Sequence, residues 1–138
     1  MNNIYSAMKA LIEKDGKYLI LESTYGNNKI KYFDLPWGRI QEWENPFETL
    51  QREILEEVAL EVEIIKSLGL WWFDRIDDKR VICHTFLCSI SSQKYIDIWK
   101  NPDNIEDIIA FHWLSKEELI QSKLFQNISI QEIFHQLP

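Results

Sequence analysis

Three glutamates, Glu53, Glu56 and Glu57, are spaced so that a helix would place all of them on one face. At about 100° per residue, their side chains would project within roughly 100° of one another. Like charges three and four residues apart repel by about a few tenths of a kcal/mol per pair. The arrangement therefore favours a bound cation, and carboxylate oxygens suit Mg²⁺ or Mn²⁺ beside a substrate phosphate.

A helix that would carry these glutamates is predicted from Pro46 to about Ala59. Asn45 is of the residue type that favours a helix N-cap, proline follows at the first helical position, and Glu48 stands three residues after the cap. The predicted buried stripe of this helix consists of Phe47, Leu50, Ile54 and Val58. Because the glutamates flank the stripe, we expect them at the edge of the core, where a cleft can form.

The glutamates also have a plainer interpretation. A solvated acidic helix face, in which Arg52 forms an i, i+4 ion pair with Glu56, is an ordinary feature of helices. Considered without their neighbours in the sequence, the three residues support this interpretation and a metal site about equally.

The longer segment 38–60 resembles the Nudix box, whose pattern is Gly-x5-Glu-x7-Arg-Glu-apolar-x-Glu-Glu-x-Gly-apolar. The positions that match are Gly38, Glu44, Arg52, Glu53, Ile54, Glu56, Glu57 and Leu60. One position departs from the pattern, since Ala59 stands where the family has glycine. Fixed residues over so long a spacing are far more specific than a lone phosphate-loop motif.

The resemblance implies a fold as well as a motif. The family's domain is about as long as this chain of 138 residues, so residues 1–138 are expected to form a single Nudix-like hydrolase domain. The implied fold class is α+β, a Nudix-like α/β/α sandwich with a mixed β-sheet packed between helices. The predicted element order, with strands on both sides of one central helix and helices at the end, agrees with this class.

The resemblance also implies roles for the matching residues. Glu53, Glu56 and Glu57 would ligate one to three divalent ions, with Mg²⁺ or Mn²⁺ as the cofactor. Arg52 would pair with a glutamate and hold it in place, and Glu44 would be a further ligand or a brace for Arg52. The implied chemistry is metal-assisted hydrolysis of a diphosphate linkage, in which a carboxylate accepts the proton of the attacking water.

Two positions are candidates for this catalytic base. Glu53 lies within the box and is the first choice. Some family members use a glutamate from a loop late in the chain, and Asp103, Glu106 and Asp107 occupy the comparable region here. Glu106 is the candidate among them, and an ordinary acidic surface loop is the alternative.

Two departures from the family bear on turnover. Trp37 stands where members commonly have a second glycine, whose backbone carbonyl can bind metal. Any residue supplies that carbonyl, but only glycine adopts a positive φ without strain. Alanine at position 59 would cost about 1 kcal/mol in the left-handed conformation of a helix-ending glycine, so the helix could end differently. Both departures weaken the prediction of efficient catalysis more than the prediction of the fold.

Several residues near the motif could bind a substrate. The aromatic residues that could stack on a base, or simply pack in the core, are Trp37, Trp71, Trp72 and Phe73. Neighbours on a strand face opposite ways, so one of Trp71 and Trp72 is expected in the core, and Trp72 is the cleft candidate. Around Gly38, which we assign to the same site, Asp34 could contact a base and Arg39 a phosphate. The alternative is that these turn-flanking charges are only solvated.

The composition restricts the class of partner. A net charge of −7 argues against binding to a nucleic-acid backbone, but not against a nucleotide beside a divalent ion. A signal peptide and a membrane span are both absent from the sequence pattern, so no membrane partner is expected. Cys83 and Cys88 would face opposite sides of one strand as reduced thiols, which favours the cytoplasm. Exposed tryptophans could equally mark a homodimer interface.

Local patterns predict the remaining elements. Strands are expected at Ile4–Glu13, Tyr18–Glu22, Arg39–Gln41, Val62–Trp72, Arg80–Ser89, Ile96–Trp99 and Ile109–Trp113. Asp15-Gly16 is a hairpin signal, and Trp37-Gly38 is expected to turn the chain. The segments Ser115–Glu118 and Ser129–Glu132 both have the capping-box pattern of a helix start.

The predicted function is hydrolysis of a nucleoside diphosphate linked to another group X. Nucleoside triphosphates are the favoured substrates, giving the monophosphate and pyrophosphate, while ADP-ribose and other nucleotide sugars are alternatives. A non-catalytic nucleotide-binding sensor on the same fold is the rival from another class. Trp37 and Ala59 favour the sensor, and the intact set of three glutamates argues against it.

Overall fold

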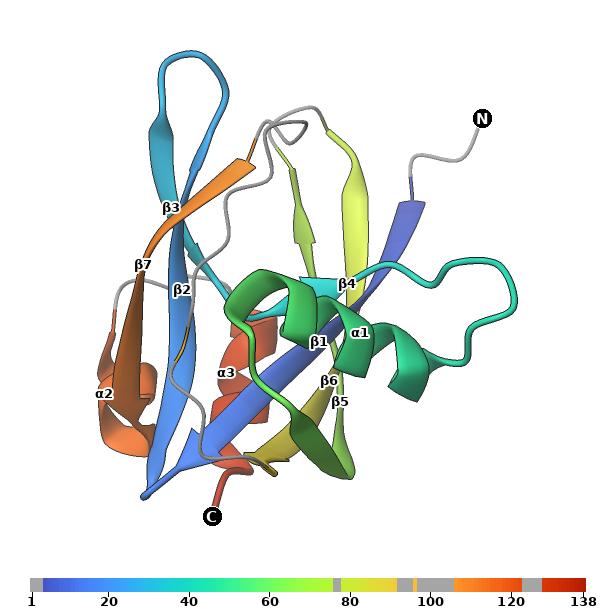
Figure 1. Ribbon diagram of the computed structural model, residues 1–138. Coiled ribbons are helices and arrows are strands. Elements are labelled where there is room, and N and C mark those ends of the chain that lie inside the picture. Colours follow the sequence, from blue (N-terminus) through green and yellow to red (C-terminus); the bar gives the residue numbers. More distant parts are fainter. Residues whose placement is uncertain (1–3, 76–77, 92–95, 97–105, 123–127) are drawn as a thin grey trace.

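The computed structural model describes residues 4–75, 78–91, 96, 106–122 and 128–138. Within them, a seven-stranded sheet is formed by β1 (Ile4–Lys14), β2 (Lys17–Tyr25), β3 (Ile30–Asp34), β4 (Trp37–Gly38), β5 (Val62–Asp74), β6 (Arg80–Ile90) and β7 (Glu106–Ser115). The helices are α1 (Pro46–Val58), α2 (Lys116–Gln121) and α3 (Ile128–His135). Figure 1 shows α1 on one face of the sheet and α3 on the other. The predicted α/β/α sandwich with a mixed sheet is confirmed.

The sheet opens between its first two strands. The main strand order is β3-β2-β1-β6-β5, with β7 also paired to β2 and β4 also paired to β1. β1 and β2 share ladder pairs only next to their hairpin turn, at Glu13↔Tyr18 and Lys14↔Lys17. Farther along, β2 pairs with β3 while β1 pairs with β4, so the segment that joins β3 to β4 crosses this opening.

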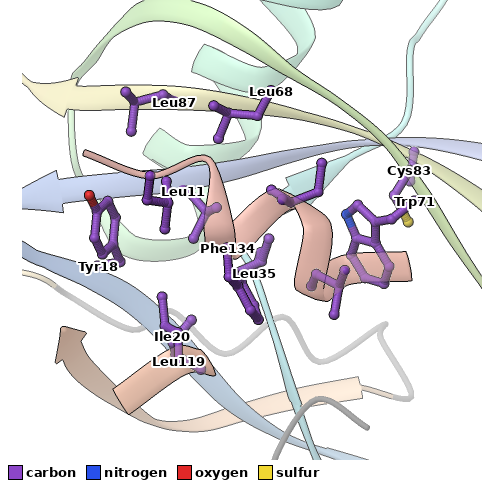
Figure 2. Packing of buried hydrophobic residues seen from close by; sticks show 14 of the residues in the cluster. Leu11, Tyr18, Ile20, Leu35, Leu68, Trp71, Cys83, Leu87, Leu119 and Phe134 are labelled. Carbon is purple, nitrogen blue, oxygen red and sulfur yellow. The ribbon is translucent and has the colours of Figure 1, made fainter. Parts of the chain in front are cut away.

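Two hydrophobic clusters occupy the two faces of the sheet. The first lies against α2 and α3, and Figure 2 shows it with Leu11, Tyr18, Ile20, Leu35, Leu68, Trp71, Cys83, Leu87, Leu119 and Phe134 labelled. The second lies against α1 and includes Leu50, Ile54 and Cys88. Cys83 and Cys88 therefore face opposite sides as predicted, and both are free and buried. β1 and β6 are parallel neighbours, and their central residues are mostly apolar and buried, as in sheets that are covered on both faces.

Helix α1 begins as its sequence predicts. The Asn45 side chain accepts a hydrogen bond from the Glu48 N–H at 2.9 Å, and proline follows the cap. Leu50, Ile54 and Val58 are fully buried, each adding about 1.5–3 kcal/mol of transfer free energy. The placement of Phe47 in this stripe is wrong, because its side chain is 52% exposed. Phe47 lies in the first turn, where its ring forms a T-shaped contact with Phe86, and Thr49 is buried instead.

The end of α1 contradicts the expectation of a different helix end at Ala59. Ala59 takes the left-handed conformation, with φ 61° and ψ 28°, and its N–H bonds to the Leu55 carbonyl at 3.0 Å. The strain costs about 1 kcal/mol. Val58 and Leu60, on either side, are fully buried, and each contributes about 1.5–3 kcal/mol. Burial of its neighbours therefore outweighs the strain at Ala59.

The segment after β3 also differs from its prediction. Trp37 and Gly38 do not turn the chain but form the short strand β4, and neither has a positive φ. The predicted strand Arg39–Gln41 is absent, because the chain leaves β1 there and enters a tight turn. In that turn the Glu44 N–H bonds to the Gln41 carbonyl at 3.0 Å, and Trp43 has a φ of 72°.

The two C-terminal capping boxes have different outcomes. The box at Ser115 is present at the start of α2. The one at Ser129 is wrong, since α3 already begins at Ile128 and places Ser129 inside the helix. The Ser129 hydroxyl instead accepts from the Trp72 N–H at 3.2 Å and donates to the Trp72 carbonyl at 3.0 Å. Its hydrogen bonds therefore join α3 to the outer edge of β5.

One of the remaining predicted strands is not found in the described residues. Of the predicted strand Ile96–Trp99, Ile96 is not in a strand and residues 97–99 lie outside the described part. The other strands are present, several of them longer than predicted. In the described residues, no helix combines the length and the apolar character needed to span a membrane.

Candidate active site

The acidic residues of α1 lie against β4. A Cβ atom added to Gly38 would fall 2.1 Å from the Cγ and 2.8 Å from the Cβ of Glu53, closer than such atoms approach in proteins. Glycine is therefore required at position 38 while Glu53 keeps its place. Since Gly38 is paired with Met8 of β1, the sheet itself fixes the position of β4 next to the helix.

Arg52 connects these acidic residues to the loop before α1. Its Nε and Nη2 donate to the two carboxylate oxygens of Glu44 at 2.6 and 3.0 Å, a bidentate geometry typical of arginine. Its Nη1 donates to Glu53 at 2.9 Å and to Glu56 at 3.3 Å. The hydrogen bonds from Arg52 are the main cause that lowers the pKa of Glu44 to about 2. The contacts predicted for Arg52 are present.

Glu57 is the carboxylate of this cluster with the weakest hydrogen bonding. Among the described residues its hydrogen-bond donor is the Trp37 N–H, at a long 3.5 Å. Burial raises the pKa of Glu57 well above its usual value, and the nearby charge of Glu53 adds to the rise. Burial also raises the pKa of Glu53, although the hydrogen bond from Arg52 acts in the opposite direction and lowers it. A cation beside these two carboxylates would stabilise their charged forms.

The donor atoms fit a hard divalent ion. Carboxylate oxygens of Glu53, Glu56 and Glu57, beside the peptide of Trp37, are the oxygen ligands that Mg²⁺ and Mn²⁺ prefer. In the part of the chain that the structure describes, no three Asp, Glu, His or Cys side chains are arranged to hold a metal ion. Arg52 forms ion pairs with two of the three glutamates, Glu53 and Glu56. A divalent ion would bind carboxylates that Arg52 also contacts.

A pocket lies beside Trp37 and is lined by residues of β1, β3, β4, β5 and β6. It holds about 360 Å³ of space, part of it open to solvent, and its lining includes Ala7, Lys9, Asp34, Trp37, Arg39 and Phe73. The Nζ of the buried Lys9 lies 2.9 and 2.8 Å from the two carboxylate oxygens of Asp34. The same Nζ is 4.9 Å from the centroid of the Trp37 ring. Trp37 thus joins the two regions, since its N–H faces Glu57 and its ring lines the pocket.

The predicted substrate residues near the turn come together here. Asp34 and Arg39 both line the pocket, and Gly38 separates Arg39 from Trp37. Asp34 is 15% exposed and ion-paired, so its charge is not simply solvated. The Arg39 guanidinium carbon lies 4.9 Å from the Tyr5 ring centroid and 5.9 Å from that of Trp37.

Two other predicted residues lie elsewhere. Trp72 does not line this pocket and is 47% exposed, whereas Trp71 is 4% exposed and donates from Nε1 to the Thr85 hydroxyl at 2.7 Å. The predicted opposite orientation of Trp71 and Trp72 is confirmed. Glu106 is the first residue of β7, paired with Tyr25, so its placement in a loop is wrong. Its side chain, that of Asp107, and all of Asp103 lie outside the described part.

Lys9 was not among the residues singled out from the sequence. It stands within Ala7–Ile12, a run in which every residue is buried. A lysine in the middle of a strand covered on both faces is the signal that could have identified it, because a buried charge requires a partner. The position of that partner depends on how β3 and β4 cross the opening of the sheet.

Comparison with known proteins agrees with this geometry. The NUDIX domain family model matches residues 5–137. A MutT protein from Methanosarcina mazei has a TM-score of 0.77 at 20% sequence identity, over 98% of this chain and 93% of that one. A MutT NUDIX hydrolase from Burkholderia pseudomallei has a TM-score of 0.75 at 19% identity, over 98% of both chains. A C. elegans Ap4A hydrolase has a TM-score of 0.70 at 13% identity, over 95% of this chain and 93% of that one. No curated protein matches the chain.

At these low identities, the similarity to solved structures establishes the fold. The family model goes further, because its match covers nearly the whole chain. It includes β4, the capped helix α1 and the carboxylates that Arg52 gathers. The chain belongs to the Nudix family of hydrolases, which act on nucleoside diphosphate derivatives and generally use divalent metal ions.

Proposed function

We propose that this Nudix hydrolase converts nucleoside triphosphates to the monophosphate and pyrophosphate with Mg²⁺ or Mn²⁺. The observation that carries the proposal is the position of Glu53 and Glu57 against β4, directly beside a pocket lined by aromatic rings. A substrate could place its phosphates at the carboxylates and its base in the pocket. Trp37 would then lie between these two parts of the substrate.

The acidic cluster provides both ligands and a base. The proposed ligands of the ion are Glu53, Glu56 and Glu57, with the Trp37 carbonyl and Glu44. A bound ion supplies neutralisation of phosphate charge and activation of water. Water adds to one phosphorus, the bridging P–O bond breaks, and Glu53 accepts the water proton, with Glu106 as the alternative base. Arg52 positions Glu53 through the 2.9 Å hydrogen bond.

The residues proposed to bind substrate surround the turn at Gly38. Asp34 and the Trp37 ring would contact the base, and Gly38 would let Glu53 lie close to the backbone of β4, beside the diphosphate. Arg39 contacts the rings of Tyr5 and Trp37, which leaves its N–H groups directed to other acceptors, such as phosphate oxygens. Trp72, half-exposed and outside the pocket lining, stays a prediction as a stacking residue.

Other substrates and another class of function remain as alternatives. ADP-ribose and other nucleotide sugars contain the same diphosphate, and the C. elegans relative is an Ap4A hydrolase. A nucleotide sensor without turnover is favoured by one observation, the ion pairs that Arg52 forms with both Glu53 and Glu56. If metal cannot displace Arg52, the protein would bind nucleotides and release no product.

Phosphate and pyrophosphate release tests the proposal. Nucleoside triphosphates, ADP-ribose and Ap4A would be incubated with Mg²⁺, with Mn²⁺ and with a chelator. Glu53→Gln should abolish metal-dependent release, whereas Glu63→Gln, at an exposed position of β5, should leave it unchanged. Nucleotide binding without release by the wild-type protein would favour the sensor.

We further infer a cytoplasmic location from the two buried, reduced thiols. The partner is a small nucleotide, with neither a nucleic-acid backbone nor a membrane involved. A homodimer would use exposed apolar residues such as Trp43, which is 93% exposed. Analytical ultracentrifugation of the wild-type protein and Trp43→Ser tests this assembly by mass.

A further inference from the structure

The pocket beyond Trp37 is lined by two aromatic rings that share one cationic neighbour. The Lys9 Nζ lies 4.9 Å from the centroid of Trp37 and 5.6 Å from that of Phe73. A flat ring that enters the pocket would therefore meet aromatic surface beside the ammonium group of Lys9.

Both rings are fixed by their neighbours. Phe73 stacks on Trp71 with 5.6 Å between centroids and an interplanar angle of 29°, and the indole N–H of Trp71 is bonded to Thr85. Trp37 is paired with Lys9 in the sheet and contacted by Arg39. Because these positions do not depend on a ligand, little ordering free energy is lost when a ring enters.

Lys9 and Asp34 have hydrogen-bonding capacity left after pairing with each other. An ammonium group has three donors, and two face the Asp34 oxygens at 2.9 and 2.8 Å. The carboxylate has about four acceptor sites; Lys9 takes two, and the Leu35 N–H takes a third at 2.7 Å. Among the residues that the structure describes, one donor and one acceptor remain on neighbouring atoms, and both residues line the pocket.

We propose that Lys9 and Asp34 recognise the hydrogen-bonding edge of a nucleobase held in the pocket that Trp37 and Phe73 line. The ligand would donate a ring or amino N–H to Asp34 and accept from Lys9 at an adjacent oxygen or nitrogen. This inference rests on the proposed function for its identification of the ligand as a nucleotide. It adds Lys9 as a specificity-determining residue and defines the required ligand as a flat ring with a donor beside an acceptor.

Recognition of the edge distinguishes nucleobases that stacking alone would bind equally well. Every base has a flat face, so stacking tolerates changes at the edge. A buried donor and acceptor left without partners disfavour a ligand whose edge is blocked. Methylation at N3 of uracil or at N1 of guanine removes the edge N–H and keeps the flat ring. Such a ligand should bind at least about tenfold more weakly than its parent.

The test is equilibrium binding without metal, measured by isothermal titration calorimetry in the presence of a chelator. UMP is compared with 3-methyl-UMP, and GMP with 1-methyl-GMP. The double variant Lys9→Met/Asp34→Asn removes both charges and leaves neither unpaired. The matched control is Arg80→Met/Asp74→Asn, which removes an ion pair whose side chains are 51% and 56% exposed and which lies outside the pocket lining.

In the wild-type protein and the control, we expect the parent of at least one pair to bind at least about tenfold more tightly. In the double variant this ratio should fall to within about twofold. Equal binding of parent and methylated ligands by the wild-type protein, or no binding of either, overturns the proposal without any variant being needed. A ratio unchanged in a double variant that thermal melting shows to be folded also overturns it. Since no hydrolysis is measured, loss of turnover and loss of edge recognition are separate outcomes.

Discussion

The acidic cluster and the pocket differ in how the chain assembles them. The cluster comes from one loop and one helix, where Glu44, Arg52 and Glu57 follow the register of α1. The pocket joins Lys9 and Asp34, which are 25 residues apart, across an opening in the sheet. In the pocket Lys9 and Asp34 pair with each other, whereas Glu57 has only a long hydrogen bond from Trp37 among the described residues. The acidic cluster therefore contains a buried carboxylate whose charge is poorly compensated, and the Lys9–Asp34 pair does not.

Gly38→Ala is expected to have the largest effect and to affect the acidic cluster alone. The new Cβ would overlap the Glu53 side chain, and moving a catalytic carboxylate by about 1 Å costs roughly a hundredfold or more in rate. Steady-state kinetics should show this loss in kcat. Binding of the best nucleoside monophosphate without metal should change by less than about threefold. An equal loss in both would mean that the two regions are not separable.

Arg52→Lys is expected to weaken the cluster without removing a carboxylate. Lysine cannot reproduce the paired hydrogen bonds to Glu44 together with the contacts to Glu53 and Glu56. Loss of such support typically lowers metal affinity or activity about 10–100-fold. Mn²⁺ titration calorimetry and kcat would both report it. Tighter Mn²⁺ binding in the variant would instead show that Arg52 chiefly competes with the ion.

Trp37→Ala tests the residue that the two regions share. Removal of one stacking wall should raise KM about tenfold, since aromatic–base contacts are worth about 1–3 kcal/mol. The backbone carbonyl is retained, so kcat should change less than KM. Trp72→Ala is the comparison, because this tryptophan is half-exposed and outside the pocket lining. A larger rise in KM for Trp72→Ala would transfer the stacking role to that residue.

Glu57→Gln is expected to have the smallest effect of these variants, and it should stabilise the protein. The folded protein raises the pKa of Glu57 above the usual 4.5, so the fold favours its protonated form. Protonated Glu57 therefore stabilises the fold, and this contribution is complete below the pKa that Glu57 has in the unfolded chain. It is lost as the pH rises through the pKa that Glu57 has in the folded protein. At neutral pH without metal, the neutral glutamine should therefore raise Tm, by about 2–4 °C for each kcal/mol of relieved desolvation. The gain should disappear near pH 4, about where wild-type Glu57 is protonated in both states.

Glu56→Gln is the control for that measurement. Glu56 lies on the same helix but its side chain is 54% exposed, so little desolvation cost exists to be relieved. Thermal melting at neutral pH should leave its Tm unchanged within about 1 °C. A similar rise in both variants would assign the gain to general repulsion along α1 instead of burial at position 57.

The difference in assembly also explains what the sequence could predict. The cap at Asn45, the buried positions Leu50 and Ile54 and the ion pair of Arg52 with Glu56 are consequences of local spacing and were predicted. The pairing of Arg52 with Glu44 was implied only by the family resemblance. Ala59 was misjudged, because its strain is local but the burial of Val58 and Leu60 that offsets it is not. Ser129 was misassigned for a similar reason, since its partner Trp72 lies on a different strand.

The pocket shows more clearly what could not be predicted from the sequence. A pattern of buried residues around Lys9 indicates that a partner is needed but not which carboxylate provides it. Asp34 takes that role because β3 pairs with β2 while β4 pairs with β1, a property of the whole sheet. The turn predicted at Trp37-Gly38 failed on the same point, since pairing with β1 keeps these residues extended.

The hydroxyl of Ser129 has a consequence for how this protein behaves in concentrated solution. β5 is the last strand on its side of the main strand order, and such an edge can template pairing with another molecule. At Trp72 the outward N–H and carbonyl are both taken by Ser129, so one side chain replaces the next strand. Farther along, the register of β5 is irregular at Ile64/Lys66 and Ser67/Gly69, which twists the edge away from a flat partner. Aggregation through this edge is thus opposed by the helix that also closes the core.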